Sequence, residues 1–199
     1  MLFLVLLVLS SQQVTGFFLN SIGLSTHVET VKELDVNKYL GRWYQMYASP
    51  SVFATFEQGA ECVTADYSIS PESNNNITVL NSETVNNPTG PLKVTHGYAI
   101  PSDEVGKLVV VLETAPLPAP YWVLKLGPKT FGPDGQYQYS VVSDFLKATL
   151  FVLARDTQTF KDFEPEILQF LNDQGFKSII NKPVKTYHGS DCLYNKNHS

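Results

Sequence analysis

Eight short segments of β-strand character follow one another with no helical pattern between them, and this succession constrains the fold more than any other feature. Most of them end at clusters of Gly, Pro, Asn, Asp or Ser. Short connections favour antiparallel pairing of successive strands. Eight strands can close into a barrel with room for side chains or one small ligand, and a two-sheet sandwich is the alternative. The segments are 42–48, 62–69, 77–85, 92–100, 107–113, 121–126, 136–142 and 149–155.

One α-helix is predicted after the last strand. Pro165 is tolerated in a first helical turn, and Gly175 stands where a left-handed C-cap is expected. A lone amphipathic helix must place its apolar face against the outside of the barrel. We therefore expect a single domain over residues 35–195, preceded by an N-terminal arm over 17–34. The apolar positions that recur at helical spacing are Ile167, Leu168, Phe170 and Leu171.

The first 16 residues predict a secretory signal peptide. Residues 2–9 form an apolar run of eight, which is too short to span a bilayer. Small residues follow at 14–16 with the spacing that signal peptidase reads, so cleavage is expected near Gly16. No Lys or Arg precedes the run, and a buried N-terminal strand is the alternative.

Cys62 and Cys192 are the two cysteines of the chain. In an oxidising compartment, an even and sparse count predicts one disulfide, and the alternative is a free reactive thiol. The disulfide would close a loop of about 130 residues, which stabilises the fold by roughly 4 kcal/mol in the chain-entropy model. Asn76 and Asn197 each begin an Asn-x-Ser/Thr sequence, so both are glycosylation acceptors if the chain is secreted.

Composition argues against several classes of partner and chemistry. The net charge is −5 and the sequence has no basic cluster, which disfavours nucleic acid and anionic membranes as partners. No serine stands in a Gly-x-Ser-x-Gly turn. We therefore expect no catalytic residue, no metal and no cofactor. The histidines lack metal-ligand spacing, at His27, His96, His188 and His198.

Residues 35–44, which read Asp-Val-Asn-Lys-Tyr-Leu-Gly-Arg-Trp-Tyr, resemble the first signature of the lipocalins. Three further segments are similar to members of that family, at 62–68, 119–124 and 151–155. They follow in the order that the family shows, over about residues 30–195. The resemblance implies an eight-stranded antiparallel calyx that is open at one end, closed at the other and flanked by one external helix.

The resemblance also implies roles for particular residues. In the family an arginine, here Arg155, lies across a tryptophan, here Trp43, at the closed end of the barrel as a cation–π contact. With Gly41 they are expected to be structural residues and not catalytic ones. Cys62 and Cys192 match a family disulfide between the second strand and the tail, which supports their pairing and leaves no thiolate for chemistry.

One family signature is missing. The lipocalin Thr-Asp-Tyr is expected at the end of the sixth strand, where residues 126–128 read Leu-Gly-Pro. Residues 143–145 read Ser-Asp-Phe, but they fall between the seventh and eighth strands, so we treat the likeness as a coincidence. We expect the connection after the sixth strand to be reshaped at the closed end. This puts in doubt any partner contact that relatives make there.

The two-residue period of a strand predicts which side chains line the barrel. Counting from Trp43 places Gln45 and Tyr47 inward, and the resemblance places Tyr67 inside. Apolar walls with a few hydroxyls and amides suit a fatty acid, sterol, retinoid or pigment. The alternative is that side chains fill the barrel. The expected ligand-binding residues are Tyr47, Tyr67, Val79, Asn81, Val110, Leu112, Tyr137 and Tyr139.

Phe53 and Phe56 follow the first strand and are expected over the open mouth, where they either aid transient contact with a membrane or lipoprotein or only cover the rim. The predicted function is that of a secreted, extracellular monomer that binds and transports a small hydrophobic ligand. One alternative is an extracellular structural, matrix or inhibitory protein that uses the barrel as a scaffold. Another, further from the pattern, is a lipid-converting enzyme.

Overall fold

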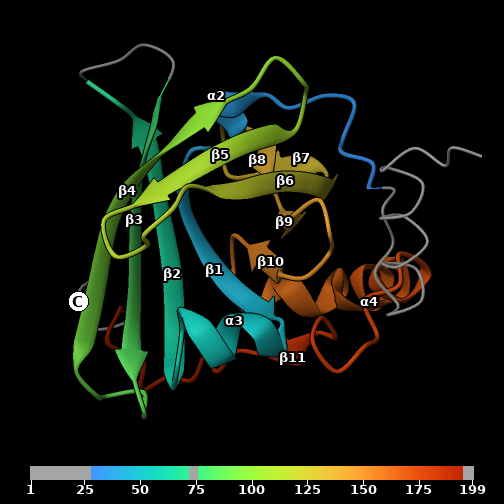
Figure 1. Ribbon diagram of the computed structural model, residues 1–199. Coiled ribbons are helices and arrows are strands. Elements are labelled where there is room, and N and C mark those ends of the chain that lie inside the picture. Colours follow the sequence, from blue (N-terminus) through green and yellow to red (C-terminus); the bar gives the residue numbers. More distant parts are fainter. Residues whose placement is uncertain (1–27, 72–75, 195–199) are drawn as a thin grey trace, which may run out of the picture.

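The computed structural model describes residues 28–71 and 76–194 and shows a closed antiparallel barrel of eight strands (Figure 1). Successive strands pair with their neighbours, and the last strand returns to pair with the first, from Tyr44 with Ala154 to Ala48 with Phe151. The predicted barrel is confirmed and the two-sheet sandwich is excluded. The barrel strands are β1 (Gly41–Ala48), β2 (Ala60–Ile69), β3 (Ile77–Val85), β4 (Leu92–Pro101), β5 (Lys107–Leu112), β6 (Ala119–Leu126), β9 (Tyr139–Ser143) and β10 (Leu150–Ala154).

Three short strands are not among the eight strands of the barrel. β11 (Val184–Lys185) adds to the edge of β1, and β7 (Lys129–Phe131) pairs with β8 (Gln136–Tyr137) in a separate hairpin. The single strand predicted over 136–142 is therefore wrong, because it is divided between β8 and β9. The division falls at Gln138, whose backbone N–H donates to the Pro128 carbonyl at 3.0 Å instead of continuing one ladder.

The predicted external helix is present as α4 (Glu164–Asp173), after the 3₁₀ turn η1 (Thr159–Asp162). Pro165 lies in the first turn of α4, and Gly175 follows its end with φ +87°. Ile167 and Leu171 of α4 are fully buried against outward-facing side chains of the barrel strands, among them Met46, Tyr139 and Val152. The outer face of this part of the wall is therefore as apolar as an interior.

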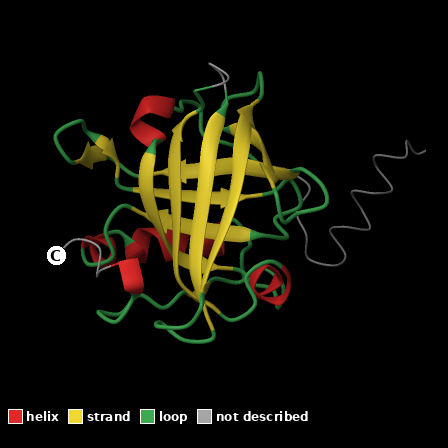
Figure 2. Ribbon diagram, turned by 90° about the vertical axis from the view of Figure 1, so that its left-hand side faces the viewer, coloured by secondary structure: helices red, strands yellow, loops and turns green. Residues whose placement is uncertain are grey.

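Two short helices were not predicted, and they lie at opposite ends of the barrel (Figure 1). α2 (Val36–Tyr39) begins at Asp35, whose carboxylate accepts from the backbone N–H groups of Asn37 and Lys38. α3 (Pro50–Thr55) occupies the connection after the first strand, where the sequence shows no helical pattern. Its proline stands at the first helical position and its Val52 is fully buried. Figure 2 shows the long strands face on, with helices at both ends.

The end of the barrel that carries α2 is closed by Arg155 and Trp43. The guanidinium carbon of Arg155 lies 3.7 Å from the centroid of the Trp43 ring. Its three nitrogens donate to backbone carbonyls of Tyr137, Arg42 and Lys38, at 3.3, 2.8 and 3.0 Å. The Trp43 indole N–H donates to the Tyr39 carbonyl at 2.8 Å. Arg155 thus joins β1, β8 and α2 at a fully buried aromatic ring.

Gly41 makes this close approach possible. Its φ is +91°, which is a conformation that residues with a Cβ rarely adopt. A Cβ at this position would lie 3.2 Å from the Nη1 atom of Arg155. The positive φ therefore favours glycine at this position, and the missing Cβ leaves room for the arginine.

The disulfide between Cys62 and Cys192 is present and joins β2 to the tail, with a Cα–Cα distance of 5.6 Å. Next to it, the Cys62 N–H donates to the Tyr187 carbonyl at 2.9 Å. The pairing of β2 with β3 shifts register between Glu61 and Thr64, which places Cys62 in an irregular stretch with φ +55°. The alternative of a free thiol is excluded, since both cysteines are bonded.

The segment where the Thr-Asp-Tyr signature is expected, residues 126–128, and the similar segment 143–145 lie in different connections of the barrel. After β6, Gly127 packs against Tyr139, where a Cβ would lie 2.6 Å from the tyrosine ring, and the β7–β8 hairpin follows. Asp144 lies in the turn between β9 and β10. Its carboxylate accepts from the backbone N–H groups of Leu146, Ala148 and Thr149 and from the Thr149 hydroxyl. Ser143 therefore ends β9, and Asp144 begins an ordinary turn to β10.

Arg155→Gln is expected to lower the free energy of unfolding by about 3 kcal/mol, because it removes the cation–π contact and leaves buried carbonyls unpaired. Arg42→Gln on the same end of β1 serves as the matched control. Arg42 forms a partly exposed ion pair with Asp66 at 2.7 Å, and the loss of such a pair costs less than about 1 kcal/mol. Urea denaturation measures both, and equal losses would show that Arg155 does not hold the closed end.

Candidate functional site

The barrel encloses a cavity of about 450 Å³, so its side chains do not fill it. The walls come from all eight barrel strands except β9, from the segment around α2, from the residues after α3, and from the β5–β6 and β9–β10 connections. Most of the lining is aliphatic or aromatic. The polar side chains among the lining residues are Tyr39, Gln45, Glu57, Thr64, Tyr67, Asn81, Tyr121, Asp144 and Thr149.

Five of the predicted ligand-binding residues line this cavity. They are contributed by β2, β3 and β5, where the two-residue alternation continues from the core of the barrel into the cavity. These residues are Tyr67, Val79, Asn81, Val110 and Leu112.

The inward orientation predicted for Tyr47 is wrong. The register between β1 and β10 shifts after Gln45, which pairs with Leu153, so that Tyr47 pairs with Val152 and Met46 is the extra residue of a bulge. The extra residue reverses the alternation, and Tyr47 packs outside the barrel. Its hydroxyl donates to Glu164 of α4.

The positions predicted for Tyr137 and Tyr139 also need correction. Tyr139 points outward and its hydroxyl donates to Glu166 of α4 at 2.6 Å, because the break at Gln138 reverses the alternation between β8 and β9. Tyr137 is inside the barrel but lies in the closed end and not at the cavity wall. Its hydroxyl accepts from the Asp35 N–H at 3.0 Å.

A group of tyrosine hydroxyls forms the floor of the cavity. The Tyr39 hydroxyl, carried by α2, lies 2.8 Å from that of Tyr121 and 2.8 Å from the Ser140 hydroxyl. Tyr121 also lies 3.2 Å from the Tyr67 hydroxyl. Burial raises the pKa of Tyr39 to about 12 and raises the pKa values of Tyr67 and Tyr121 as well. The floor therefore offers neutral hydrogen-bonding groups and no charge.

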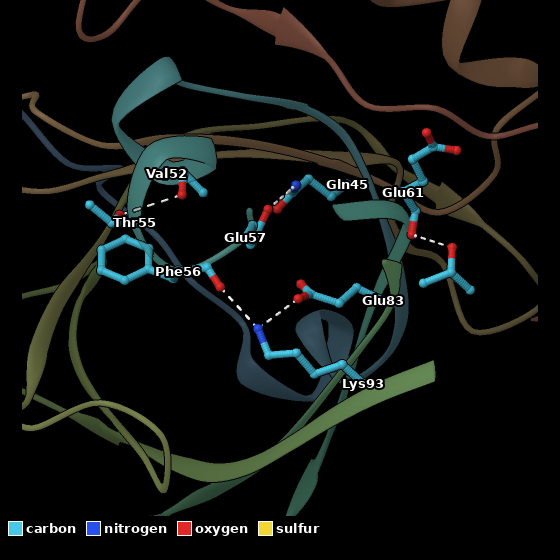
Figure 3. A network of polar contacts seen from close by, with 9 residues as sticks. Gln45, Val52, Thr55, Phe56, Glu57, Glu61, Glu83 and Lys93 are labelled. Atoms are coloured by element: carbon cyan, nitrogen blue, oxygen red, sulfur yellow. Dashed lines mark hydrogen bonds and ion pairs between the residues drawn. The ribbon is translucent and has the colours of Figure 1, made fainter. Parts of the chain in front are cut away.

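A carboxyl group lies at the other end, just after α3. The half-buried side chain of Glu57 points to Gln45 of β1, whose Nε2 donates to Glu57 Oε2 at 2.6 Å (Figure 3). Burial is the main cause that raises the pKa of Glu57 from 4.5 to about 7. The nearby Glu83 raises the pKa further, while the Gln45 hydrogen bond and Lys93 lower it. The pKa of Glu57, a carboxyl group on the cavity wall, thus lies near neutral pH.

Sequence reasoning missed Tyr39, Tyr121 and Glu57 as lining residues. Tyr121 could have been found by extending the two-residue alternation to the sixth strand. Tyr39 precedes the Gly-x-Trp motif, but only the turn of α2 shows that its ring enters the barrel. Glu57 stands directly after an apolar segment that the sequence placed at the mouth, which was a usable signal.

Phe56 and Phe53 differ in position. Phe56 lines the cavity next to Glu57 and is 56% exposed, as expected for a residue at the mouth. Phe53 is half-buried on α3 and does not line the cavity. Asn76 directly precedes β3 in a half-exposed position, and its carbonyl accepts from the Ser70 N–H at 3.0 Å. Asn197, His27, His198 and the predicted signal peptide lie outside the described residues.

The remaining histidines belong to other surroundings. His96 is exposed on β4, and His188 in the tail bonds the Gln45 carbonyl and the Tyr194 hydroxyl. Over residues 28–71 and 76–194, no three His, Cys, Asp or Glu side chains come together in a way that could hold a metal ion. Within the same residues, no helix has the length and apolar character needed to cross a membrane.

Comparison with known proteins gives the family. The family model described as Lipocalin domain matches residues 23–195. The chain belongs to the lipocalin family. Lipocalins are known for binding small hydrophobic ligands, and relatives such as apolipoprotein D and crustacyanin are binding or transport proteins and not enzymes.

Apolipoprotein D of Rattus norvegicus is 38% identical over 117 residues, which cover 55% of this chain and 58% of the relative. This lipocalin is therefore apolipoprotein D-like, as its motifs indicate, although it spans little more than half the length of that relative. Temperature-induced lipocalin-1 of Arabidopsis thaliana is 28% identical over 165 residues, covering 80% of this chain and 82% of the relative. Among solved structures, lobster apocrustacyanin A1 has the same fold, with a TM-score of 0.58, 18% identity and coverage of 80% and 83% of the two chains.

The raised pKa of Glu57 predicts a pH-dependent stability. The pKa of Glu57 is about 7 in the folded state against an ordinary 4.5. The stabilising contribution of Glu57 to the free energy of unfolding is therefore fully present below about pH 4.5 and is lost as the pH rises through 7. Glu57→Gln removes this titration. Between pH 5 and pH 8, the free energy of unfolding of the wild type should therefore fall by about 1–2 kcal/mol relative to that of the variant. Urea denaturation across this range measures the difference, and parallel curves would contradict the burial of the charge.

Proposed function

We propose that this lipocalin binds and transports a small hydrophobic ligand inside its barrel. The observation that carries the proposal is the cavity of about 450 Å³ with mostly apolar walls and a closed floor. Its volume falls in the range of small-molecule sites. A ligand that buries roughly 200 Å² of apolar surface gains about 5 kcal/mol from desolvation. Membership of a family known for binding such ligands supports the same function.

The proposed contacts follow from the lining. The body of the ligand packs against aliphatic residues such as Val79, Val110 and Leu112, and Asn81 offers an amide at the wall. The tyrosine hydroxyls of the floor orient a polar group at the deep end. Because these groups are held by the barrel itself, the site needs no cofactor to bind its ligand.

We also propose that contact with a membrane or lipoprotein surface, when it occurs, is made through Phe56. Phe56 is more than half exposed beside the mouth, whereas Phe53 does not line the cavity. An apolar ring at the mouth would let a ligand pass from a lipid phase into the cavity without full hydration.

We propose that the protein is secreted and glycosylated at Asn76. The Cys62–Cys192 disulfide supports an oxidising compartment. Expression in a secreting cell should yield protein in the medium whose amino terminus lies near residue 17. Asn76→Gln should remove the mass that peptide-N-glycosidase releases from the wild type. Retention inside the cell with an intact amino terminus would contradict secretion.

Val110→Trp tests the cavity as the ligand site. The new ring would occupy space on the inner face of β5, so binding of the neutral apolar dye Nile red should weaken at least about tenfold. The matched control is Val109→Trp, at the neighbouring position that faces outward and is 39% exposed. Fluorescence titration should give about one site per chain in the wild type and the control. Equal binding by Val110→Trp would place the dye elsewhere, and no binding to the wild type would favour a scaffold without a ligand.

A further inference from the structure

We infer that the cavity selects ligands that carry a protonated amine on an apolar body, and that Glu57 is the group that binds the amine. The inference rests on the proposed function, because it assigns a ligand class to the same cavity.

The charges on the cavity wall are all acidic. Among the described residues that line it, there is no lysine, arginine or histidine, and the two ionisable carboxyl groups are Glu57 and Asp144. Asp144 already accepts four hydrogen bonds within its own turn. Glu57 is therefore the carboxyl that remains available to a guest.

Glu57 has accepting capacity that the protein does not use. A carboxylate has room for about four hydrogen bonds. In the described part of the chain the donor to the Glu57 side chain is Gln45, which reaches Oε2. An ammonium group carries three donors and forms charge-assisted hydrogen bonds with a carboxylate. Amine and carboxylate are thus complementary in both charge and hydrogen bonding.

The neighbouring charges do not neutralise Glu57. Lys93 lies on the adjacent wall, but its Nζ is bonded to Glu83 Oε1 at 2.7 Å and to the Phe56 carbonyl at 3.0 Å (Figure 3). Glu57, Glu83 and Lys93 together carry one net negative charge when Glu57 is ionised. A cation entering the mouth is attracted, and a ligand carboxylate is repelled.

The backbone holds Glu57 in place. The Glu57 N–H donates to the Val52 carbonyl of α3 at 3.2 Å, and its own carbonyl accepts from the Ala60 N–H at 3.1 Å. Its side chain therefore starts from a fixed point between α3 and β2. A held carboxyl group loses little conformational entropy when it binds a ligand.

This arrangement narrows the ligand classes suggested by the sequence. An ionised fatty acid with its carboxylate at the mouth would place two negative charges together in a partly desolvated site. With its carboxylate at the floor it would be desolvated among neutral hydroxyls, where the guanidinium of Arg155 is already bonded to backbone carbonyls. An amphipathic amine would pair its positive charge with Glu57 and pack its apolar body against the walls.

The test compares three probes of similar size in a Nile red displacement assay at about pH 8: phenylbutylamine, phenylbutyrate and pentylbenzene. The wild type should bind the amine about tenfold more tightly than pentylbenzene, and phenylbutyrate most weakly. Glu57→Gln keeps an acceptor for Gln45 but removes the charge. It should abolish the amine preference, so that phenylbutylamine no longer binds more tightly than pentylbenzene.

Glu113→Gln is the matched control, because Glu113 is exposed and does not line the cavity. It should retain the amine preference of the wild type. An amine preference that survives Glu57→Gln, or a wild type that prefers phenylbutyrate, would overturn the inference while leaving a carrier function intact. If Nile red and pentylbenzene both fail to bind the wild type, the proposed function itself fails.

Discussion

The pairing of β10 with β1 is the constraint on which the rest of the structure depends. It removes the free edges of the sheet, and it turns a curved wall into an enclosure with an inside and an outside. The same two strands carry Trp43 on their inner side, with Arg155 directly after β10, and supply Met46 and Val152 to the outer core beneath α4. The pairing of these two strands therefore determines the closure of the barrel, the floor of its cavity and the position of α4.

The cavity differs in polarity between its two ends. At the floor, burial keeps the tyrosine hydroxyls neutral, and the positive charge of Arg155 is directed to backbone carbonyls and to the Trp43 ring. At the mouth, the Glu57 carboxyl group faces the cavity, and the ammonium group of the neighbouring Lys93 is already paired with Glu83. The apolar walls between these ends favour a ligand that is itself apolar in the middle. Shape alone would admit many guests, so the polar ends are where discrimination arises.

The fold could be predicted from the sequence because its signals are local. Seven of the eight runs of strand-forming residues and the lone helix before Gly175 depend on nearby residues and were located correctly, while the run over 136–142 is divided between β8 and β9. Arg155 could be assigned only through the family resemblance, since no local pattern places it on Trp43, more than a hundred residues earlier.

The site was less predictable because it depends on where the alternation of a strand is interrupted. Met46 and Gln138 are single residues that reverse the phase of the strand positions after them, and neither is marked by Gly or Pro. Tyr47 and Tyr139 consequently moved from the predicted cavity to the helix interface. Glu57 lies on no strand at all, so a period of two could not find it.

The tail after β11 is bonded to β1 and β2 beside the residue that orients Glu57. Thr186 donates its N–H to the Met46 carbonyl at 2.9 Å, His188 bonds the Gln45 carbonyl, and Cys192 fastens the segment to β2. Gln45, which orients Glu57, is thus supported from behind by residues about 140 positions later in the chain. A proteolytic cut in the tail, or reduction of its disulfide, would therefore loosen the strands beside the opening first, while the sealed end of the barrel stayed intact.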